Sequence, residues 1–557
     1  MRRPGDEKRS RLTILLLLTI LSAAVLGGWF GERVNAGTPL KEETQKLLKS
    51  FTETLAIVES DYAHEADAEG LLESAIRGLL RSLDPHSSFF SRTDYKKLRE
   101  EQQGKYYGLG ITIRPESPGS GRVVVVDPPA SGTPAYKVGI RAGDVIAKIE
   151  GESIHDWELM EEVIQNLKGP KGTKVNITIE RPGVPEPIEM SVERDEIPLY
   201  TIKYAFHLDS TTGYIRIERF SETTSKELDE ALEKLKESEL EALILDLRNN
   251  PGGALSQAIE VTDRFIEKGQ LVVKTRMRRG KGHEYLAPRG RRHDYPMVVL
   301  INRSSASASE IVAGALQDHD RALIVGETSF GKALVQTIYP LESNRGLALT
   351  TGKYYTPSDR LIQRNYSESF YDYFWGARNQ ESDESERTVS YTDSGRTVFG
   401  GGGITPDEKV SAERLSKLLQ QVRRKSLFQK FAERLADGEI VSDVRFHYTS
   451  QERAGLTRED KARLRDELVI SEQTLIHFQQ LLKENEVDFT EETFNKDRRL
   501  IVNLLKQRLF AKLLDDEEGK RASLEVDRQV QRAVKLLPKA RALFQDMAAK
   551  KRADSVQ

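Results

Sequence analysis

The spacing of apolar positions divides the chain into regions with different predicted secondary structure. Between about residues 40 and 103, apolar side chains recur at three- and four-residue steps, which predicts amphipathic helices interrupted by a turn at residues 84–88. From residue 104 to about 196, short apolar runs alternate with glycine and proline, which predicts a compact β-rich module with one helix at residues 157–167.

Strands and helices alternate in the region that follows. Strands are predicted at residues 212–217, 242–247, 297–301 and 322–325, and a helix follows each of the first three. This alternation predicts a mostly parallel sheet with helices on its faces, and sites in such sheets lie beyond the carboxyl ends of the strands. Residues 365–392 are predicted to form a polar surface loop, and the charged remainder after residue 410 has helical periodicity.

The amino terminus carries a basic cluster followed by a charge-free apolar run from Leu12 to Phe30. Such a run predicts export across a membrane, and its length is at the border between a signal-peptide core and a membrane span. A small-residue cleavage site at Val34 to Ala36 leaves both a cleaved signal and a retained anchor open.

Composition then limits the kind of chemistry. The 557 residues, with 38% hydrophobic side chains, are enough for several packed domains. Lys and Arg total 84 against 87 Asp and Glu, so the net charge of -3 lacks the basic excess of a nucleic-acid binder. There is no cysteine, which excludes thiol nucleophiles, thiolate metal sites and disulfides.

Two predicted strand ends carry candidate chemistry. After the strand at 242–247, the segment Asn249-Asn250-Pro251-Gly252-Gly253 could present backbone N–H groups to a developing negative charge, or it could be an ordinary turn. After the strand at 297–301, the segment Ser305-Ala306-Ser307-Ala308-Ser309 could present a nucleophilic serine. Ser307 and Glu310 also fit a capping box, which is purely structural.

The segment 326–333 nearly matches a phosphate-binding loop. It contains GxxxxGK, but Ala333 stands where a serine or threonine is required, and the following residues predict a strand instead of a helix. Lys332 lies between apolar neighbours, where desolvation would leave a neutral amine able to accept a proton. A solvated surface lysine is the alternative.

Together the three segments supply a nucleophile, a base and oxyanion donors. A Ser-His-Asp triad is the competing interpretation, with His319 as its best base. We expect His319 to be solvated at a helix end, and His86 to be solvated in a proline-containing turn. Metal hydrolysis is disfavoured because the nine histidines form no HExxH or comparable ligand pair.

Six motifs follow one another along the chain: SLDPHSS, DLRNNPGG, SASASEIVAGALQD, GETSFGK, KYYTPSDRLIQ and GGGITPD. In type and order they resemble the carboxyl-terminal processing peptidases, or tail-specific proteases, which are Ser-Lys serine peptidases. The likeness extends from about residue 40 to 410. It implies an α/β catalytic domain with a mixed sheet and helices, similar to crotonase and ClpP.

The resemblance also assigns site residues, although spacing alone does not separate Ser307 from Ser305 or Ser309. It implies that Ser307 is the nucleophile, that Lys332 is the general base, and that Gln336 orients this base. The implied oxyanion donors are the backbone N–H groups of Ala308 and of Gly252 or Gly253. Glycine commonly follows the lysine in this family, whereas Ala333 follows it here.

The β-rich module resembles a PDZ domain. Gly108-Leu109-Gly110-Ile111 is similar to the loop whose N–H groups bind the terminal carboxylate of a peptide. Residues 137–146 resemble the AGL-x-x-GDVI segment of such modules, with Val138 in place of the usual alanine.

The predicted protein is an exported serine endopeptidase, extracytoplasmic or periplasmic, that binds protein C-termini through its PDZ domain and cuts near that end without a cofactor or metal. The alternative is a non-catalytic PDZ scaffold for exported proteins. Besides protein substrates, the expected partners are the membrane, through the N-terminal segment, and a second copy of the chain; nucleic acid is not expected. The predicted regions are a signal or anchor (residues 1–36), a helical region (37–103), the PDZ domain (104–196), the catalytic domain (197–410) and a charged helical region (411–557).

Overall fold

The computed structural model describes residues 41–554, apart from 117–119, 158–159, 237–238, 291–292, 368–372, 375–386, 437 and 441–454. The chain forms two compact units, residues 1–78 and 79–557. The first contains helix α2 (Glu42–Asp61) and most of α3 (Ala68–Arg81). Within the described ranges, no helix has the length and apolarity needed to cross a bilayer. The predicted segment Leu12 to Phe30 lies outside these ranges.

The second unit begins with a turn, a short strand and a helix. Strand β1 (Ser88–Phe90) and helix α4 (Arg92–Gln103) follow the turn at residue 84. The helical pattern of residues 40–103 did not predict β1. This strand forms because it pairs antiparallel with β18 (Arg345–Tyr355), far away in sequence.

The β-rich module is a small sheet around its own apolar core. Strands β3, β4, β5, β7 and β8 follow one another in the sheet, with β6 paired to β5 and β2 paired to β9. The strand bounds are Lys105–Gly108, Ile113–Pro115, Val123–Val125, Val145–Ile149, Glu152–Ser153, Lys174–Glu180, Ile188–Glu193 and Asp195–Pro198 for β2 to β9. The helices are α5, η1 and α6, at Pro134–Lys137, Ile154–Asp156 and Met160–Leu167.

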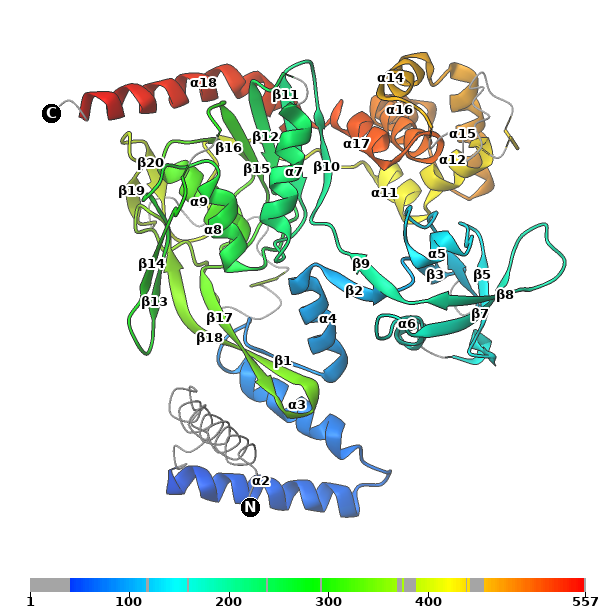
Figure 1. Cartoon of the computed structure of the whole chain (residues 1–557), viewed down its shortest axis with the longest axis horizontal. Helices are drawn as coiled ribbons and strands as arrows, with labels where there is room; N and C mark the ends of the chain where they lie inside the picture. Colours follow the sequence, from blue (N-terminus) through cyan, green and yellow to red (C-terminus); the bar gives the residue numbers. More distant parts are fainter. Residues whose placement is uncertain are drawn as a thin grey trace, which may run out of the picture. The chain divides into compact units, whose positions relative to one another are not determined.

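A six-stranded sheet forms the centre of the following region, in the order β10-β11-β12-β15-β16-β21. The strands from β10 to β16 are labelled in Figure 1. Strands β10 and β11 are antiparallel and all other neighbours are parallel, as the alternating pattern predicts. The strand bounds are Ile202–His207, Thr212–Ile217, Ala242–Asp246, Met297–Ile301, Leu323–Gly326 and Glu408–Lys409.

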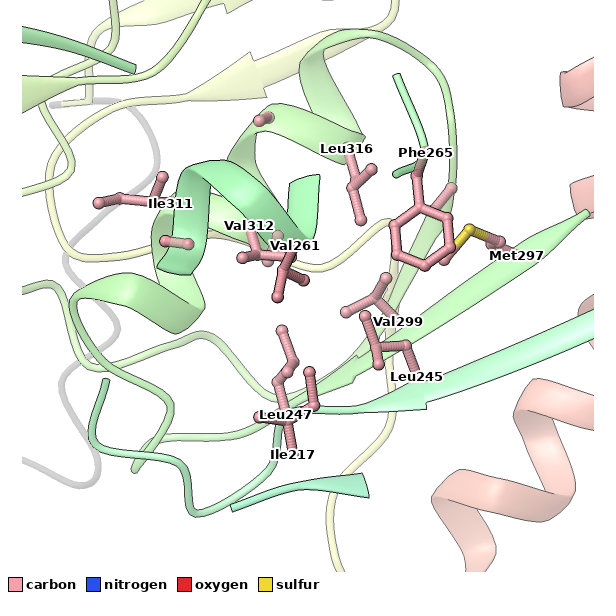
Figure 2. Close-up of a cluster of buried hydrophobic side chains, with 14 of the residues drawn as sticks. Ile217, Leu245, Leu247, Val261, Phe265, Met297, Val299, Ile311, Val312 and Leu316 are labelled. Carbon is pink, nitrogen blue, oxygen red and sulfur yellow. The ribbon is translucent and has the colours of Figure 1, made fainter. Parts of the chain in front are cut away.

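Helices α7 (Thr224–Lys236), α8 (Leu255–Asp263) and α9 (Ala308–Asp318) pack on one face of this sheet. In Figure 2, Leu245 and Val299 of the sheet point toward Val261 of α8 and Val312 of α9. Their burial removes apolar surface from water, which contributes roughly 1.5–3 kcal/mol for each large side chain.

The opposite face of the sheet is covered by the C-terminal helix α18 (Arg528–Asp554). Ile244 and Val298 alternate in sequence with residues of the first face and pack with Val530 and Leu536 of α18. A parallel strand buried on both faces has a nearly continuous apolar sequence, and residues 242–247 are apolar except for Asp246. The predicted boundary at residue 410 therefore separates, in sequence, two segments that share one core.

A second, antiparallel sheet lies beside the first, in the order β1-β18-β13-β14, with β17 also paired to β18. Strands β13, β14 and β17 are Leu271–Met277, His283–Leu286 and Leu334–Leu341, and the turn η2 is Glu342–Asn344. A separate hairpin pairs β19 with β20, Val389–Tyr391 with Thr397–Phe399. The prediction that residues 365–392 form a surface loop is wrong at Tyr373, because the side chain of this residue is buried.

The segment between β21 and α18 folds as a helical bundle with its own apolar core. Its helices α11, α12, α14, α15, α16 and α17 are Lys417–Arg424, Leu427–Ala436, Arg458–Glu467, Glu472–Glu484, Glu491–Leu513 and Asp516–Leu524. The helical periodicity predicted after residue 410 corresponds to apolar side chains that face this core.

Candidate active site

Three loops meet at the carboxyl ends of the neighbouring strands β12, β15 and β16. The Asn249 N–H donates to Asn302 Oδ1 at 2.9 Å, and Asn302 Nδ2 donates back to Asn249 Oδ1 at 2.9 Å. The Ala306 N–H donates to the main-chain oxygen of Asn250 at 3.0 Å, and the Phe330 N–H donates to that of Ser305 at 2.9 Å. The three segments found in the sequence therefore form one site.

The three alternate serines of the second loop differ in what their hydroxyls do. Ser305 Oγ donates to the main-chain oxygen of Leu247 at 2.8 Å, and Ser309 Oγ donates to that of Asn250 at 3.0 Å; both serines are fully buried. Ser307 is half-buried, between them. The hydroxyls of Ser305 and Ser309 are used to connect the two loops, so Ser307 is the serine whose hydroxyl could react with a substrate.

Ser307 has an unusual backbone conformation. Its φ of 54° and ψ of -113° lie in a region that residues with a side chain rarely adopt. Such strain, of order 1–3 kcal/mol, persists where the surroundings impose it, and it often occurs at functional sites. This backbone conformation turns the chain from the loop after β15 into α9 and places Ser307 at the start of the helix.

Glu310 imposes this conformation from inside the protein. Its fully buried carboxylate accepts the N–H of Ser307 at 2.8 Å and that of Lys332 at 2.9 Å on the same oxygen, Oε2. Oε1 accepts from Ser329 Oγ at 2.5 Å and from the Gly331 N–H at 2.7 Å. Burial raises the pKa of Glu310 to about 7, although these donors favour the ionised form. The half of the predicted capping box that Glu310 supplies is present, and this glutamate also joins the serine loop to the lysine loop.

Tyr354 of β18 is a second link between the two loops, and local sequence patterns did not predict this contact. Its buried hydroxyl lies 3.2 Å from the main-chain oxygen of Ser307 and also hydrogen-bonds the main-chain oxygen of Lys332. Burial raises the pKa of this phenol well above its ordinary value, so the group remains a neutral donor. Antiparallel pairing within the second sheet, which places β18 here, is not visible in local sequence patterns.

The glycine loop packs directly against Ser307. A side chain on Gly252, which has a φ of 100°, would lie 2.8 Å from Ser307 Cβ and 2.9 Å from the Ala308 nitrogen, so glycine is required. The Gly252 N–H donates to Asn250 Oδ1 at 2.8 Å. Among the hydrogen bonds of the described residues, none has the N–H of Gly253 or Ala308 as donor. Of the two predicted glycines, Gly253 therefore has the available N–H.

Lys332 is held by a chain of hydrogen bonds. Its Nζ donates to Gln336 Oε1 at 2.8 Å, and Gln336 Nε2 donates to the main-chain oxygen of His86 at 2.5 Å. Burial lowers the pKa of Lys332, and nearby Glu310 and Asp84 oppose this shift. The chain after Lys332 continues as strand β17, which excludes the phosphate-binding loop because that loop must open a helix.

The expectation that His86 is solvated is wrong. Asp84 accepts the N–H groups of His86 and Ser87 at 2.8 Å each, which folds the turn back toward β17. The His86 ring hydrogen-bonds the Tyr373 hydroxyl at 2.8 Å and packs edge-on against Phe330. Burial, with a contribution from the Lys332 charge, lowers the pKa of His86 to about 4. His86 is therefore neutral beside the lysine.

His319 is also buried, contrary to expectation, but it belongs to a different place in the fold. It lies at the C-terminal end of α9, where its ring bonds Asp393 at 2.8 Å and the main-chain oxygen of Leu271 at 2.7 Å. These acceptors raise the pKa of His319 although burial opposes them. His319 is at the opposite end of the helix from Ser307, so it does not complete a Ser-His-Asp triad with that serine.

The predicted carboxylate-binding loop lies between strands β2 and β3. Leu109 is buried, and Gly110 has a φ of 78° with Thr133 packed against it, so a side chain there would clash. Among the described residues, no hydrogen bond has the N–H of Leu109, Gly110 or Ile111 as donor. Strand β3 is at the edge of its sheet, where another strand can add.

Comparison with known proteins identifies the class. Peptidase family S41 matches residues 211–368, and the PDZ domain family matches residues 108–192. A carboxy-terminal-processing protease of Bartonella bacilliformis is 42% identical over 328 residues, which are 58% of this chain and 74% of that protein. Carboxy-terminal processing protease CtpA of Bacillus subtilis is 32% identical over 388 residues, 69% of this chain and 78% of the relative.

Among solved structures, a photosystem II D1 C-terminal processing protease is 25% identical and covers 67% of this chain and 93% of its own, with a TM-score of 0.34. The matches define an S41 peptidase that carries a PDZ domain. The chain belongs to the carboxy-terminal processing protease family and is a protease, as the motifs predict.

Proposed function

We propose that this protease is a serine endopeptidase that cleaves proteins near their C-termini through an acyl-enzyme on Ser307. The observation that carries the proposal is that Glu310 Oε2 binds the N–H groups of both Ser307 and Lys332. One buried carboxylate thus holds the nucleophile and the base in register. Preorganisation of this kind is what acyl transfer requires, because reacting groups must be placed before the transition state forms.

Proton transfer follows from the environment of Lys332. A buried amine with a lowered pKa is neutral more often than a surface lysine, and the neutral amine accepts the Ser307 proton as the oxygen attacks the scissile carbonyl. Gln336 takes one N–H of the amine, which fixes the direction of its lone pair. The resulting ammonium returns a proton to the leaving amine, and water then hydrolyses the ester.

The negative charge of the tetrahedral intermediate needs donors beside Ser307. The N–H groups of Gly253 and Ala308 are the donors we assign, because Gly252 donates to Asn250. Removal of one such donor in an acyl-transfer site typically costs about 10²- to 10³-fold in kcat. Tight packing of Gly252 against Ser307 fixes the distance between these donors and the nucleophile.

The test is covalent labelling with a serine-directed phosphonate. We expect one equivalent to bind, and peptide mass spectrometry to place it on Ser307. The variant Ser307→Ala is expected to stay unlabelled, although Ser305 and Ser309 are still present. Labelling at either of those serines, or unchanged labelling of the variant, would contradict the assignment.

We assign substrate selection to the PDZ domain, whose loop at residues 108–111 would bind the terminal carboxylate of a protein while the chain adds to β3. The Ser307→Ala variant allows binding to be measured without turnover. Peptides with apolar C-terminal residues are expected to bind at least about tenfold more tightly than the same peptides with a C-terminal amide, because hydrogen bonds to a charged group contribute about 1.5–3 kcal/mol. Equal affinity of the two forms by calorimetry would exclude recognition of the carboxylate.

We further propose that the protein acts outside the cytoplasm, because the basic cluster and the apolar run Leu12 to Phe30 have the pattern of an export signal. Fractionation of cells that make the full chain is expected to place it in the membrane or extracytoplasmic fraction. Mass spectrometry of the mature N-terminus separates a retained anchor from cleavage after Ala36. Recovery of the intact chain in the cytosol would contradict export.

A further inference from the structure

The short connection between α17 and α18 contacts the strand ends that carry the catalytic loops. Asp527 ends this connection and Gln529 lies in the first turn of α18. Asp527 also caps the helix, since its Oδ1 accepts the N–H groups of Gln529 at 3.0 Å and Val530 at 3.1 Å. In Figure 1, α18 lies next to β15 and β16, and its contacts extend to β12.

Arg248 connects this turn to the glycine loop. Its side chain, only 7% exposed, donates to Asp246 Oδ2 at 2.7 Å, to Asp527 Oδ2 at 2.8 Å and to Gln529 Oε1 at 2.8 Å. The next residue, Asn249, begins the loop that leads to Gly253. A buried guanidinium must keep its partners, since a single lost partner leaves an uncompensated charge inside the protein.

Gln529 connects the same turn to the lysine loop. Its Nε2 donates to the main-chain oxygen of Val410 at 2.7 Å, and the Val410 N–H donates to the main-chain oxygen of Gly326 at 2.7 Å. Gly326 is the last residue of β16, and the loop that it begins ends at Lys332. One amide side chain therefore bridges the ends of β12 and β16, the strands from which the oxyanion donor and the base are presented.

We propose that Asp527 and Gln529 are positioning residues for the peptidase site, which makes the start of α18 part of the catalytic apparatus. They touch neither substrate nor reacting atoms. They act through Arg248 on the Asn249 to Gly253 loop and through Val410 on the loop that ends at Lys332. The proposal rests on the Ser307 mechanism, and its test separates the two.

The experiment compares two substitutions that preserve the helix. Gln529→Met keeps the length of the side chain but removes both of its hydrogen bonds. Asp527→Asn keeps an N-cap residue of high preference while removing the charge that faces Arg248. Because misplacement of a catalytic group by about 1 Å costs up to about 10²-fold, we expect kcat on a peptide substrate to fall about 10- to 100-fold. KM is expected to stay within about twofold of the wild-type value, because the changes leave the peptide-binding loop intact.

Arg532→Ala is the matched control. Arg532 lies on the same helix and pairs with Glu408 of β21 at 2.6 Å, but this pair is on the surface and does not reach β12. The control is expected to keep the wild-type kcat. Far-UV circular dichroism and thermal unfolding establish that each variant is folded at the assay temperature; if Asp527→Asn unfolds, Gln529→Met alone decides the outcome.

Phosphonate labelling separates the two levels of the proposal. Labelling of wild-type Ser307 with slower labelling of folded Gln529→Met supports the positioning role. Equal labelling rates and equal kcat values for folded Gln529→Met and wild type would overturn it while leaving the Ser307 mechanism in place. Absence of Ser307 labelling in the wild type would instead refute that mechanism, and the positioning role with it.

Discussion

Replacement of Ser307 by alanine is expected to lower kcat/KM for a peptide substrate by about 10⁴-fold or more, because alanine has no oxygen with which to form the acyl-enzyme. The residual rate would come from binding and the oxyanion donors alone. Steady-state hydrolysis of a fluorogenic peptide measures the loss. The matched control is Ser304→Ala, since Ser304 is exposed in the same loop and is expected to be dispensable. Near-normal turnover by Ser307→Ala would contradict the mechanism.

The same position is expected to show a conflict between stability and activity. Ser307→Ala keeps the strained φ of 54° and the N–H bond to Glu310, so its thermal unfolding should stay close to that of the wild type. Ser307→Gly accepts this φ without steric cost and should exceed Ser307→Ala in free energy of unfolding by about 1 kcal/mol. Denaturant unfolding of the two variants measures the difference. A glycine variant less stable than the alanine variant would mean that the backbone at residue 307 is not strained.

Replacement of Lys332 by alanine is expected to lower kcat/KM by about 10³-fold or more, the range typical for loss of a general base. Lys332→Arg should not restore activity, because a guanidinium stays protonated at all accessible pH values and cannot accept the Ser307 proton. Lys234 lies on α7, exposed, and Lys234→Ala serves as the control. Activity of Lys332→Arg within tenfold of the wild type would assign the lysine an electrostatic role instead of proton transfer.

The pH dependence has a defined sign. The reactive form of Lys332 is the neutral amine, so kcat/KM should rise with pH and level off above the pKa of the lysine. Because burial lowers this pKa below the ordinary value of 10.5, the plateau should begin at a lower pH than for an exposed lysine. The pH profile of peptide hydrolysis, recorded over the range in which circular dichroism is constant, measures the midpoint. A profile that falls across this range would contradict a lysine base.

The parallel sheet and its loops were predictable because their signals are local. A mostly apolar run such as residues 242–247 marks a strand buried on both faces, and polar residues after such a run mark the strand end. Where three such ends are neighbours in a sheet, their loops must meet. The choice among the alternate serines required three-dimensional information, since only the contacts of Ser305 and Ser309 distinguish them from Ser307.

Other parts of the site depend on pairing between distant segments and had no local signal. Tyr354 reaches Ser307 because β18 pairs with β13 and β17. His86 looked like a solvated turn residue, but the contact between its main-chain oxygen and Gln336 buries the turn. The spacing of Ser307 and Glu310 predicts only a helix cap, because the second partner of Glu310, Lys332, lies in another loop. Burial of these groups is a property of the tertiary fold.

Coverage of the sheet by α18 has a consequence for folding. The face of β12 and β15 that α18 covers is apolar, and this helix lies more than 200 residues further along the chain than β15. This face stays exposed to water until α18 is available, and the contact between the two segments closes a very long loop. Native contacts between segments so distant in sequence slow folding, because the entropy of loop closure is lost before the contacts form. The sheet therefore reaches its final packing only after α18 has docked on it.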